Sequence, residues 1–151
     1  MKNGSKTRRI LLDTNILRAY MNHEDSLHLS VVNRIVALRA AGYELLIAPQ
    51  CLYELWVVLT RPVEANGLGK SPEEADEVCS ELREDFTLLP DPNDLVDEWQ
   101  SLCRAYSIRG RRAHDARLVA WMVKHQVNAI LTLNPEDFRA FAGLVQVEEV
   151  R

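Results

Sequence analysis

Short apolar runs alternate along the chain with longer segments whose apolar residues recur at helical spacing. The short runs predict strands, and they occupy residues 10–12, 44–48, 86–89, 129–133 and 144–147. The periodic segments predict helices, which occupy residues 15–21, 26–41, 49–59, 71–85, 93–106 and 113–125, with a further short helix after residue 134. Because strands alternate with helices, we predict the α/β class with a mainly parallel sheet.

Two of the predicted helices begin with a capping pattern. Ser71 is followed by Pro72, which suits the first helical position, and three residues on by Glu74, which predicts a capping box. Asn134 and Asp137 have the same spacing, so they predict a second one.

The length of the chain, 151 residues, corresponds to one domain over residues 1–151. A core of that size needs no disulfide or structural metal to fold. Three widely spaced cysteines without a CxxC motif indicate reduced thiols in a cytoplasmic protein. No apolar run is long enough to span a membrane, and the first nine residues lack the apolar core of a secretory signal. We therefore expect no membrane partner.

Charge is distributed unevenly along the sequence. The net charge is −4, which is too acidic for nucleic-acid binding by bulk charge alone. Residues 73–98 contain eleven acids and one arginine, whereas residues 101–125 contain five arginines, one lysine and one aspartate. We therefore expect one surface that repels phosphate and another that attracts it.

Two acidic residues occupy positions where burial is expected. Asp13 directly follows the strand at residues 10–12, at the end of the strand where α/β sheets bind ligands. Glu54 lies in a helix that is apolar on nearly every side, which predicts burial of both sides of that helix. The simpler alternatives are that Asp13 only caps the next helix and that Glu54 is exposed among surface valines.

Asp115 is the clearest case of an acid on an apolar stripe. It shares the i, i+3, i+4 and i+7 positions with Leu118, Val119 and Met122. The opposite side of this helix is predicted to carry Arg117, Trp121 and Lys124. An acid in the first turn also complements the helix dipole, but that alternative explains an exposed acid better than an inward one.

Asn134 and Asp137 follow the strand at residues 129–133, so they too lie at the carboxyl edge of the predicted sheet. Several oxygens that converge on one edge repel each other unless a cation is present. Hard divalent ions prefer such ligands, and Mg²⁺ typically uses one or two carboxylates together with water and substrate phosphate. An all-oxygen site of this kind favours phosphodiester hydrolysis.

Four motifs in order give the chain a family resemblance that covers nearly its whole length. The sequence ILLDTNIL at residues 10–17, the lone Glu54, HDARLVA at residues 114–120 and ILTLN at residues 130–134 resemble the four motifs of PIN-domain nucleases. The resemblance implies a three-layer α/β/α sandwich with about five strands, Mg²⁺ or Mn²⁺ dependence, and cleavage of single-stranded RNA. Small members of this kind are most often VapC-type toxins, which are silenced by a cognate antitoxin and are often homodimers.

The resemblance also implies roles for individual residues. The catalytic set is Asp13, Glu54, Asp115 and Asn134, where the family usually has Asp at the last position. An amide adds no negative charge, so Asp137 is the alternative fourth metal ligand beside Asp13, Glu54 and Asp115. Thr14 supplies a further polar contact.

The substrate-binding set that we expect is Asn15, Arg111, Arg112 and Arg117. Arginine suits bidentate contact with phosphate, and these three arginines surround Asp115 in the sequence. The alternative is a solvated basic run that pairs with the acidic residues 73–98.

Other functions are weighed against this one. A PIN-like module without catalysis, which binds RNA or protein, would be marked by Asn134 in place of Asp. A phosphotransfer domain with Asp13 as nucleophile would want a second aspartate at position 15, where the chain has Asn. A dinucleotide-binding domain needs GxGxxG after the first strand, and the chain has DTNIL there.

Overall fold

The computed structural model describes residues 8–150, and in this range five strands form one parallel sheet. The strands are β1 (Arg8–Leu12), β2 (Tyr43–Ile47), β3 (Thr87–Leu88), β4 (Ala129–Leu131) and β5 (Gln146–Glu148). Their order across the sheet is β3-β2-β1-β4-β5, and every neighbouring pair is parallel. The five predicted strands are thus confirmed, although β3 and β4 are shorter than expected and β5 begins two residues later.

Helices connect consecutive strands. They are α1 (Thr14–Met21), α2 (His28–Ala40), α3 (Pro49–Thr60), α4 (Pro72–Asp85), α5 (Leu95–Ala105) and α6 (Arg112–His125), with the short 3₁₀ helices η1 (Val63–Ala65) and η2 (Pro135–Phe141). The segment between α3 and α4 contains one helical turn, η1. None of the helices in residues 8–150 is long and apolar enough to cross a membrane.

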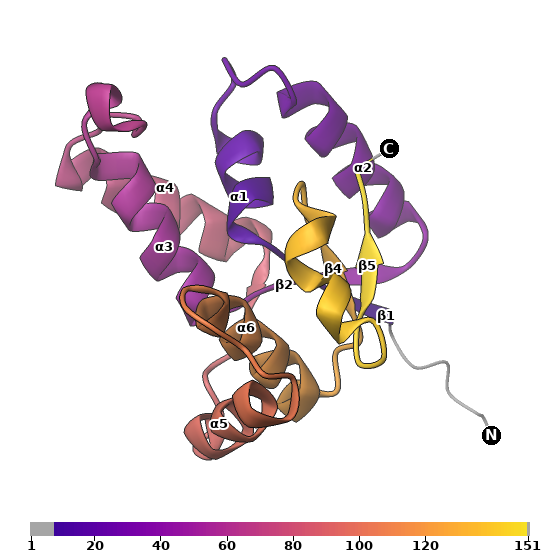
Figure 1. Cartoon of the computed structure of the whole chain (residues 1–151). Coiled ribbons are helices and arrows are strands. Elements are labelled where there is room, and N and C mark those ends of the chain that lie inside the picture. Colours follow the sequence, from indigo (N-terminus) through magenta and orange to yellow (C-terminus); the bar gives the residue numbers. More distant parts are fainter. Residues whose placement is uncertain (1–7, 151) are drawn as a thin grey trace.

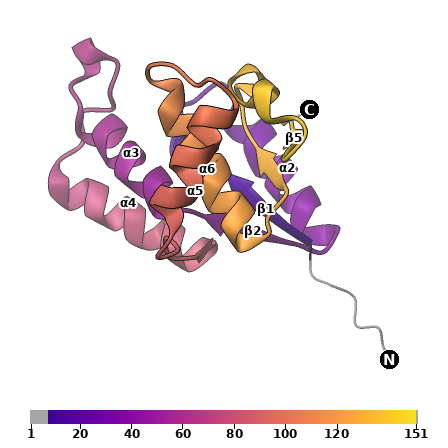
Figure 2. The same ribbon diagram turned by 60° about the horizontal axis from the view of Figure 1, so that its bottom comes forward.

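The helices divide into two groups that cover the two faces of the sheet. α1 packs against α2 and α3, and α3 packs against α4, whereas α5 packs against α6 and α6 against η2. Figure 1 and Figure 2 show α5 and α6 together on one side of the strands, with α2 on the other. This is the expected α/β/α sandwich.

The order of the strands places a switch point next to β1. From β1 the chain proceeds to β2 and β3 in one direction, and then returns to β4 and β5 on the other side. The connections after β1 and after β4 thus leave the sheet in opposite directions, which opens a crevice between the carboxyl ends of these two strands. The residues that follow β1 and β4 are Asp13 and Thr132.

The central strands and the helices share one apolar core. Ile10, Leu11 and Leu12 of β1 are fully buried, as are Ile130 and Leu131 of β4. Continuous burial is typical of parallel strands covered on both faces, and it explains why short apolar runs marked these strands in the sequence.

Two helices are buried differently from the prediction. The outer side of α3 is exposed, with Tyr53 66%, Trp56 37% and Val57 54% accessible, so the prediction that both sides of α3 are buried is wrong. Conversely, Trp121 is fully buried although we placed it on the polar side of α6. The reason is that α5 packs on α6, and a neighbour of this kind cannot be read from the periodicity of α6 alone.

Only one of the two predicted capping boxes forms. The Ser71 hydroxyl accepts from the Glu74 N–H, and the Glu74 carboxylate accepts from the Ser71 N–H. Asn134 precedes η2 but makes no capping hydrogen bond through its side chain, so the second box is absent. The described cysteines Cys51, Cys79 and Cys103 are free thiols, as expected.

Candidate active site

Asp13 connects the two central strands at their carboxyl ends. Its backbone N–H donates to the Leu131 carbonyl at 3.0 Å, and its Oδ1 accepts from the Thr14 N–H at 2.8 Å, which caps α1. Its Oδ2 accepts from the Thr132 hydroxyl at 2.8 Å and lies 3.3 Å from the Asn15 amide nitrogen. The side chain is 8% exposed. Asp13 is therefore both a helix cap and a buried, hydrogen-bonded carboxylate at the switch point.

Asn15 and Thr132 hold the loop after β4 against the loop after β1. Asn15 Oδ1 accepts from the Leu133 N–H at 3.0 Å, and its amide nitrogen lies 3.3 Å from Thr132 Oγ1. Thr132 Oγ1 also accepts from the Asn134 N–H at 3.0 Å. We expected Asn15 to contact substrate, and in this structure it is engaged in ordering the site. Thr132 was missed, although a hydroxyl directly after a buried apolar strand was the signal that could have found it.

Glu54 reaches the same region from α3. Its Oε1 accepts from the Thr14 hydroxyl at 2.8 Å, and its Oε2 accepts from the Gln50 amide at 3.1 Å. The side chain is half-buried, between the deep burial that we predicted and the exposed alternative. Both oxygens are thus held by donors that lie beside Asp13 or one helical turn earlier on α3.

The pKa values of Asp13 and Asp115 reflect burial and the charges of nearby acids. Burial raises the pKa of Asp13 to about 6, and the charges of Glu54 and Asp137 add to the shift. Burial likewise raises the pKa of Asp115 to about 7, reinforced by Asp137, Asp13 and Glu54 and opposed by Arg112. A carboxylate whose pKa is raised by neighbouring negative charges lies close to those charges. The structure therefore brings Asp13, Glu54, Asp115 and Asp137 together from four elements.

Asn134 and Asp137 differ in what they contribute. Both side chains are exposed, but only the Asp137 charge acts on the pKa of Asp13 and Asp115. The Asn134 N–H fixes its backbone to Thr132, two residues earlier.

The basic residues separate into exposed and engaged side chains. Arg111 and Arg112 are exposed at the start of α6, where Arg112 is close enough to lower the pKa of Asp115. Arg117 instead donates to Gln50 Oε1 and to Asp91 Oδ2, both at 2.8 Å. A second pair, Lys124 with Asp94, lies farther along the same helix. Part of the basic segment thus pairs with the acidic segment, as the simpler alternative predicted.

The donor set determines which metal the site could hold. The converging side chains offer oxygen ligands, which suit Mg²⁺ or Mn²⁺ rather than zinc. Within residues 8–150, no three His, Cys, Asp or Glu side chains are arranged to hold an ion by themselves. This matches a cation that takes one or two carboxylates and completes its shell with water and phosphate oxygens.

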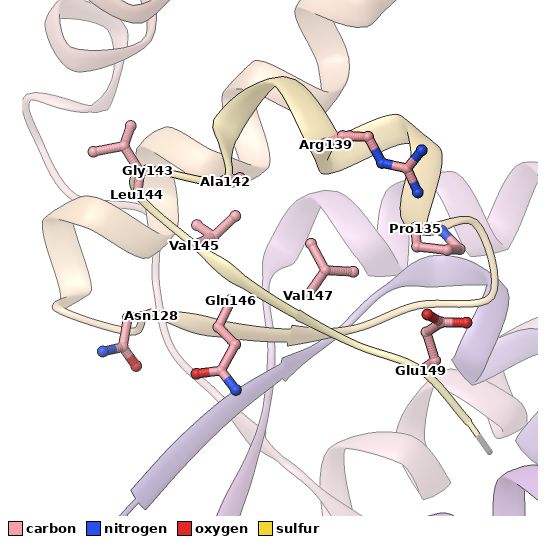
Figure 3. A pocket seen from close by; sticks show the side chains of 10 residues that line it. All are labelled: Asn128, Pro135, Arg139, Ala142, Gly143, Leu144, Val145, Gln146, Val147 and Glu149. Atoms are coloured by element: carbon pink, nitrogen blue, oxygen red, sulfur yellow. The ribbon is translucent and has the colours of Figure 1, made fainter.

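A surface pocket of about 490 Å³ lies elsewhere, between η2 and β5 (Figure 3). Its lining includes Arg139, Leu144, Val147 and Glu149, and none of the four acids contributes to it. This pocket is therefore separate from the candidate site at the switch point.

A comparison with protein families settles the class of this arrangement. The model of the PIN domain matches residues 10–144. The chain belongs to the PIN domain family. The match spans all four motifs, from the strand before Asp13 to beyond Asp137. No curated protein matches the chain.

Solved structures share the PIN fold at low sequence identity. VapBC2 from Rickettsia felis, bound to a DNA fragment from its promoter, has a TM-score of 0.68 at 16% identity, covering 93% of this chain and 98% of the other. VapBC from Salmonella typhimurium, also DNA-bound, has a TM-score of 0.65 at 15% identity, with coverages of 95% and 99%. VapC20 from Mycobacterium tuberculosis, a sarcin-ricin loop cleaving toxin, has a TM-score of 0.62 at 20% identity, with coverages of 91% and 96%.

Proposed function

We propose that residues 1–151 form a single PIN-like nuclease domain that hydrolyses phosphodiester bonds in RNA with the help of Mg²⁺ or Mn²⁺. The observation that carries the proposal is the group of acids at the switch point of a PIN fold, where neighbouring negative charges help to raise the pKa of Asp13 and Asp115. Repulsion of this kind destabilises the folded chain, so the group is best explained by a cation that binds there.

The acids proposed as ligands of the ion are Asp13, Glu54, Asp115 and Asp137, of which one or two would bind it directly and the others through coordinated water. A bound divalent ion polarises the phosphate and lowers the pKa of a coordinated water. Thr132 and Thr14 donate to Asp13 and Glu54, which keeps the oxygens of these carboxylates oriented toward the pocket. Asn134 lies between Thr132 and Asp137, and we assign it a polar contact in the catalytic group, with no charge of its own.

The exposed Arg111 and Arg112 are proposed to bind substrate phosphates beside Asp115. Their position at the start of α6 places positive charge next to the acidic pocket, and Arg112 already acts on Asp115 across that distance. A single RNA strand, or a strand presented by folded RNA, meets this geometry. Asn15 would reach substrate only if its present hydrogen bonds to the loop after β4 were exchanged.

The biological setting follows from the structures that the chain resembles. Because several of them are VapBC complexes, we propose that this chain is the toxin of a toxin–antitoxin pair in the cytoplasm, a homodimer with a cognate antitoxin. The neighbouring gene tests this: a small reading frame for a DNA-binding antitoxin is the expected finding.

The first prediction tests the chemistry itself. Changing Asp13 to Asn should abolish divalent-dependent cleavage of single-stranded RNA, since loss of a metal ligand lowers the rate by orders of magnitude. The assay compares both proteins with Mg²⁺, with Mn²⁺ and with chelator. Cleavage that survives in Asp13→Asn would exclude Asp13 as a ligand.

A PIN-like binding module without catalysis is the second candidate. Asn134, at a position where the resemblance calls for Asp, is the observation that favours it. The same assay separates the two, because a module of this kind binds RNA but leaves it intact with either metal.

A further inference from the structure

Gln50 connects two elements of the candidate site that otherwise pack sparsely against each other among the described residues, α3 and α6. Its amide nitrogen lies 3.1 Å from Glu54 Oε2 and 2.9 Å from the carbonyl oxygen of His114, the residue before Asp115. Gln50 is 6% exposed, and it is one of three buried polar or charged side chains in the described core. A single amide thus holds one acid and the backbone beside another.

The orientation of this amide is fixed by its partners. Arg117 can only donate, so the oxygen of Gln50 must face it, and the observed Nη1–Oε1 distance is 2.8 Å. The nitrogen then has to face Glu54 and the His114 carbonyl, which can both accept. A flipped amide would place its nitrogen against the Arg117 guanidinium. Arg117 therefore decides that Gln50 presents a donor to Glu54.

Arg117 is itself held by Asp91. Its Nη2 lies 2.8 Å from Asp91 Oδ2, and both side chains are about 30% exposed, at 31% and 29%. Asp91 lies between Pro90 and Pro92, which restrict the backbone of that loop. His125, at the end of α6, contacts the Pro90 carbonyl at 2.7 Å and fixes the loop to the helix that carries Arg117.

We propose that Asp91, Arg117 and Gln50 form a positioning relay that orients Glu54 for metal binding and sets its separation from Asp115. In this assignment Arg117 acts through Gln50 and does not bind substrate phosphate, unlike Arg111 and Arg112. The inference rests on the proposed function, because it assigns the relay to the same metal site. It names positioning residues; none of the three touches the reacting atoms.

The decisive measurement is the affinity for Mn²⁺ without RNA, read from the electron paramagnetic resonance signal of free Mn²⁺. Gln50→Ala should weaken binding by about 10- to 100-fold, as is typical when a group that orients a metal ligand is lost. Gln50→Met keeps the length of the side chain without its hydrogen bonds, so it should weaken binding as well if polarity is what matters. Gln100→Ala, an exposed glutamine on α5, is the matched control and should bind like the wild type.

A double-mutant cycle tests whether Arg117 acts through Gln50. Arg117→Ala alone should weaken Mn²⁺ binding, and the Gln50→Ala/Arg117→Ala double variant should bind no more weakly than Gln50→Ala, because both remove the same connection. Arg117→Lys keeps the charge but loses the fork of donors, so it should restore binding only in part. Arg83→Ala on α4 is the exposed arginine control.

RNA cleavage distinguishes the relay from substrate binding. If the relay is correct, Arg117→Ala lowers kcat when Mn²⁺ is limiting, because the variant binds the metal more weakly. The salt dependence of RNA binding stays unchanged. If Arg117→Ala instead raises KM, flattens the salt dependence and leaves Mn²⁺ affinity intact, Arg117 is a phosphate contact and the relay is overturned.

Failure of the relay and failure of the proposed function give different results. A folded Gln50→Ala and Gln50→Met pair that bind Mn²⁺ like the wild type overturns the relay, whether or not RNA is cleaved. A wild type that leaves RNA intact but loses Mn²⁺ affinity on Gln50→Ala supports the relay and contradicts the nuclease. A wild type that does not bind Mn²⁺ contradicts both. Circular dichroism of each variant confirms that it folds.

Discussion

At the residue scale, Asp13 combines a structural role with a chemical one. The same carboxylate caps α1 through Oδ1 and receives the Thr132 hydroxyl through Oδ2. The sequence posed these roles as alternatives, cap or site, because a capping aspartate and a metal-binding aspartate look the same in one dimension. In the fold they coincide, since the first residue after a central parallel strand also begins the next helix.

Other residues of the site show where sequence reasoning ends. Asp13, Asp115 and Asp137 could be predicted because an acid beside an apolar run is conspicuous. Gln50 could not, because its importance comes from partners as far as 64 residues away in the chain. Thr132 was signalled only by its place after a buried strand, and its partner Asp13 is 119 residues away. The pairing of Arg117 with Asp91 was equally hidden, since it depends on how α6 packs beside the loop after β3.

The raised pKa values predict how stability depends on pH in the absence of metal. Asp13 and Asp115 bind protons more tightly when folded, with pKa values of about 6 and about 7 against the ordinary aspartate value of 3.8. Between these limits the folded chain holds more protons than the unfolded chain, so the free energy of unfolding should fall as pH rises from about 4 to about 7. Below about pH 4 both aspartates are protonated in the folded and the unfolded chain, so they no longer lower the free energy of unfolding.

Asp115→Asn should remove much of this pH-dependent loss of folding stability. At pH 8 in chelator we expect the variant to be more stable than the wild type by about 1 kcal/mol, less than its full pKa shift would give because the side chain is only half-buried. Mg²⁺ should reverse the order, because the wild type gains more binding free energy. Urea titrations with chelator and with Mg²⁺ measure both. A destabilised variant in chelator, with no effect of Mg²⁺ on either protein, would mean that the acids are unrelated caps.

At the scale of elements, helix boundaries and burial were predicted with different success. Caps, prolines and apolar spacing are local signals, and they placed all six α-helices within a few residues of their observed bounds. The burial of one side of a helix depends on which other elements pack against it. The exposed outer side of α3 and the buried Trp121 of α6 were both misjudged, because the sequence of one helix does not say which other helix covers it.

The two capping patterns predict losses of folding stability of different size. Ser71→Ala removes the side-chain acceptor of the Glu74 N–H, one of the two hydrogen bonds of a formed capping box, and should lower the free energy of unfolding by about 1 kcal/mol. Asn134→Ala removes a side chain that makes no capping bond, so the loss should be clearly smaller. Chemical denaturation of both variants checks this. Equal losses would show that the Asn134 side chain caps η2 in solution.

At the scale of the whole molecule, ion pairs decide which basic side chains remain free to bind a polyanion such as the proposed RNA substrate. Ion pairs consume part of the basic segment, since Arg117 pairs with Asp91 and Lys124 with Asp94. Arg111 and Arg112 are left exposed at the start of α6, next to Asp115. Some of the exposed positive charge thus lies beside the candidate site, although the net charge of the chain is −4 and other exposed arginines, such as Arg83 and Arg104, lie elsewhere.

This arrangement predicts a local, salt-dependent contribution to RNA binding. Replacing both Arg111 and Arg112 with Ala should weaken binding of single-stranded RNA and lower the slope of log affinity against log salt by roughly 1.4, at about 0.7 per lost phosphate contact. Binding is measured in chelator, so that the RNA stays intact. The double control Arg83→Ala/Arg104→Ala removes the same charge from exposed positions on α4 and α5. If the control flattens the slope equally, only net charge matters, and the start of α6 is not where RNA binds.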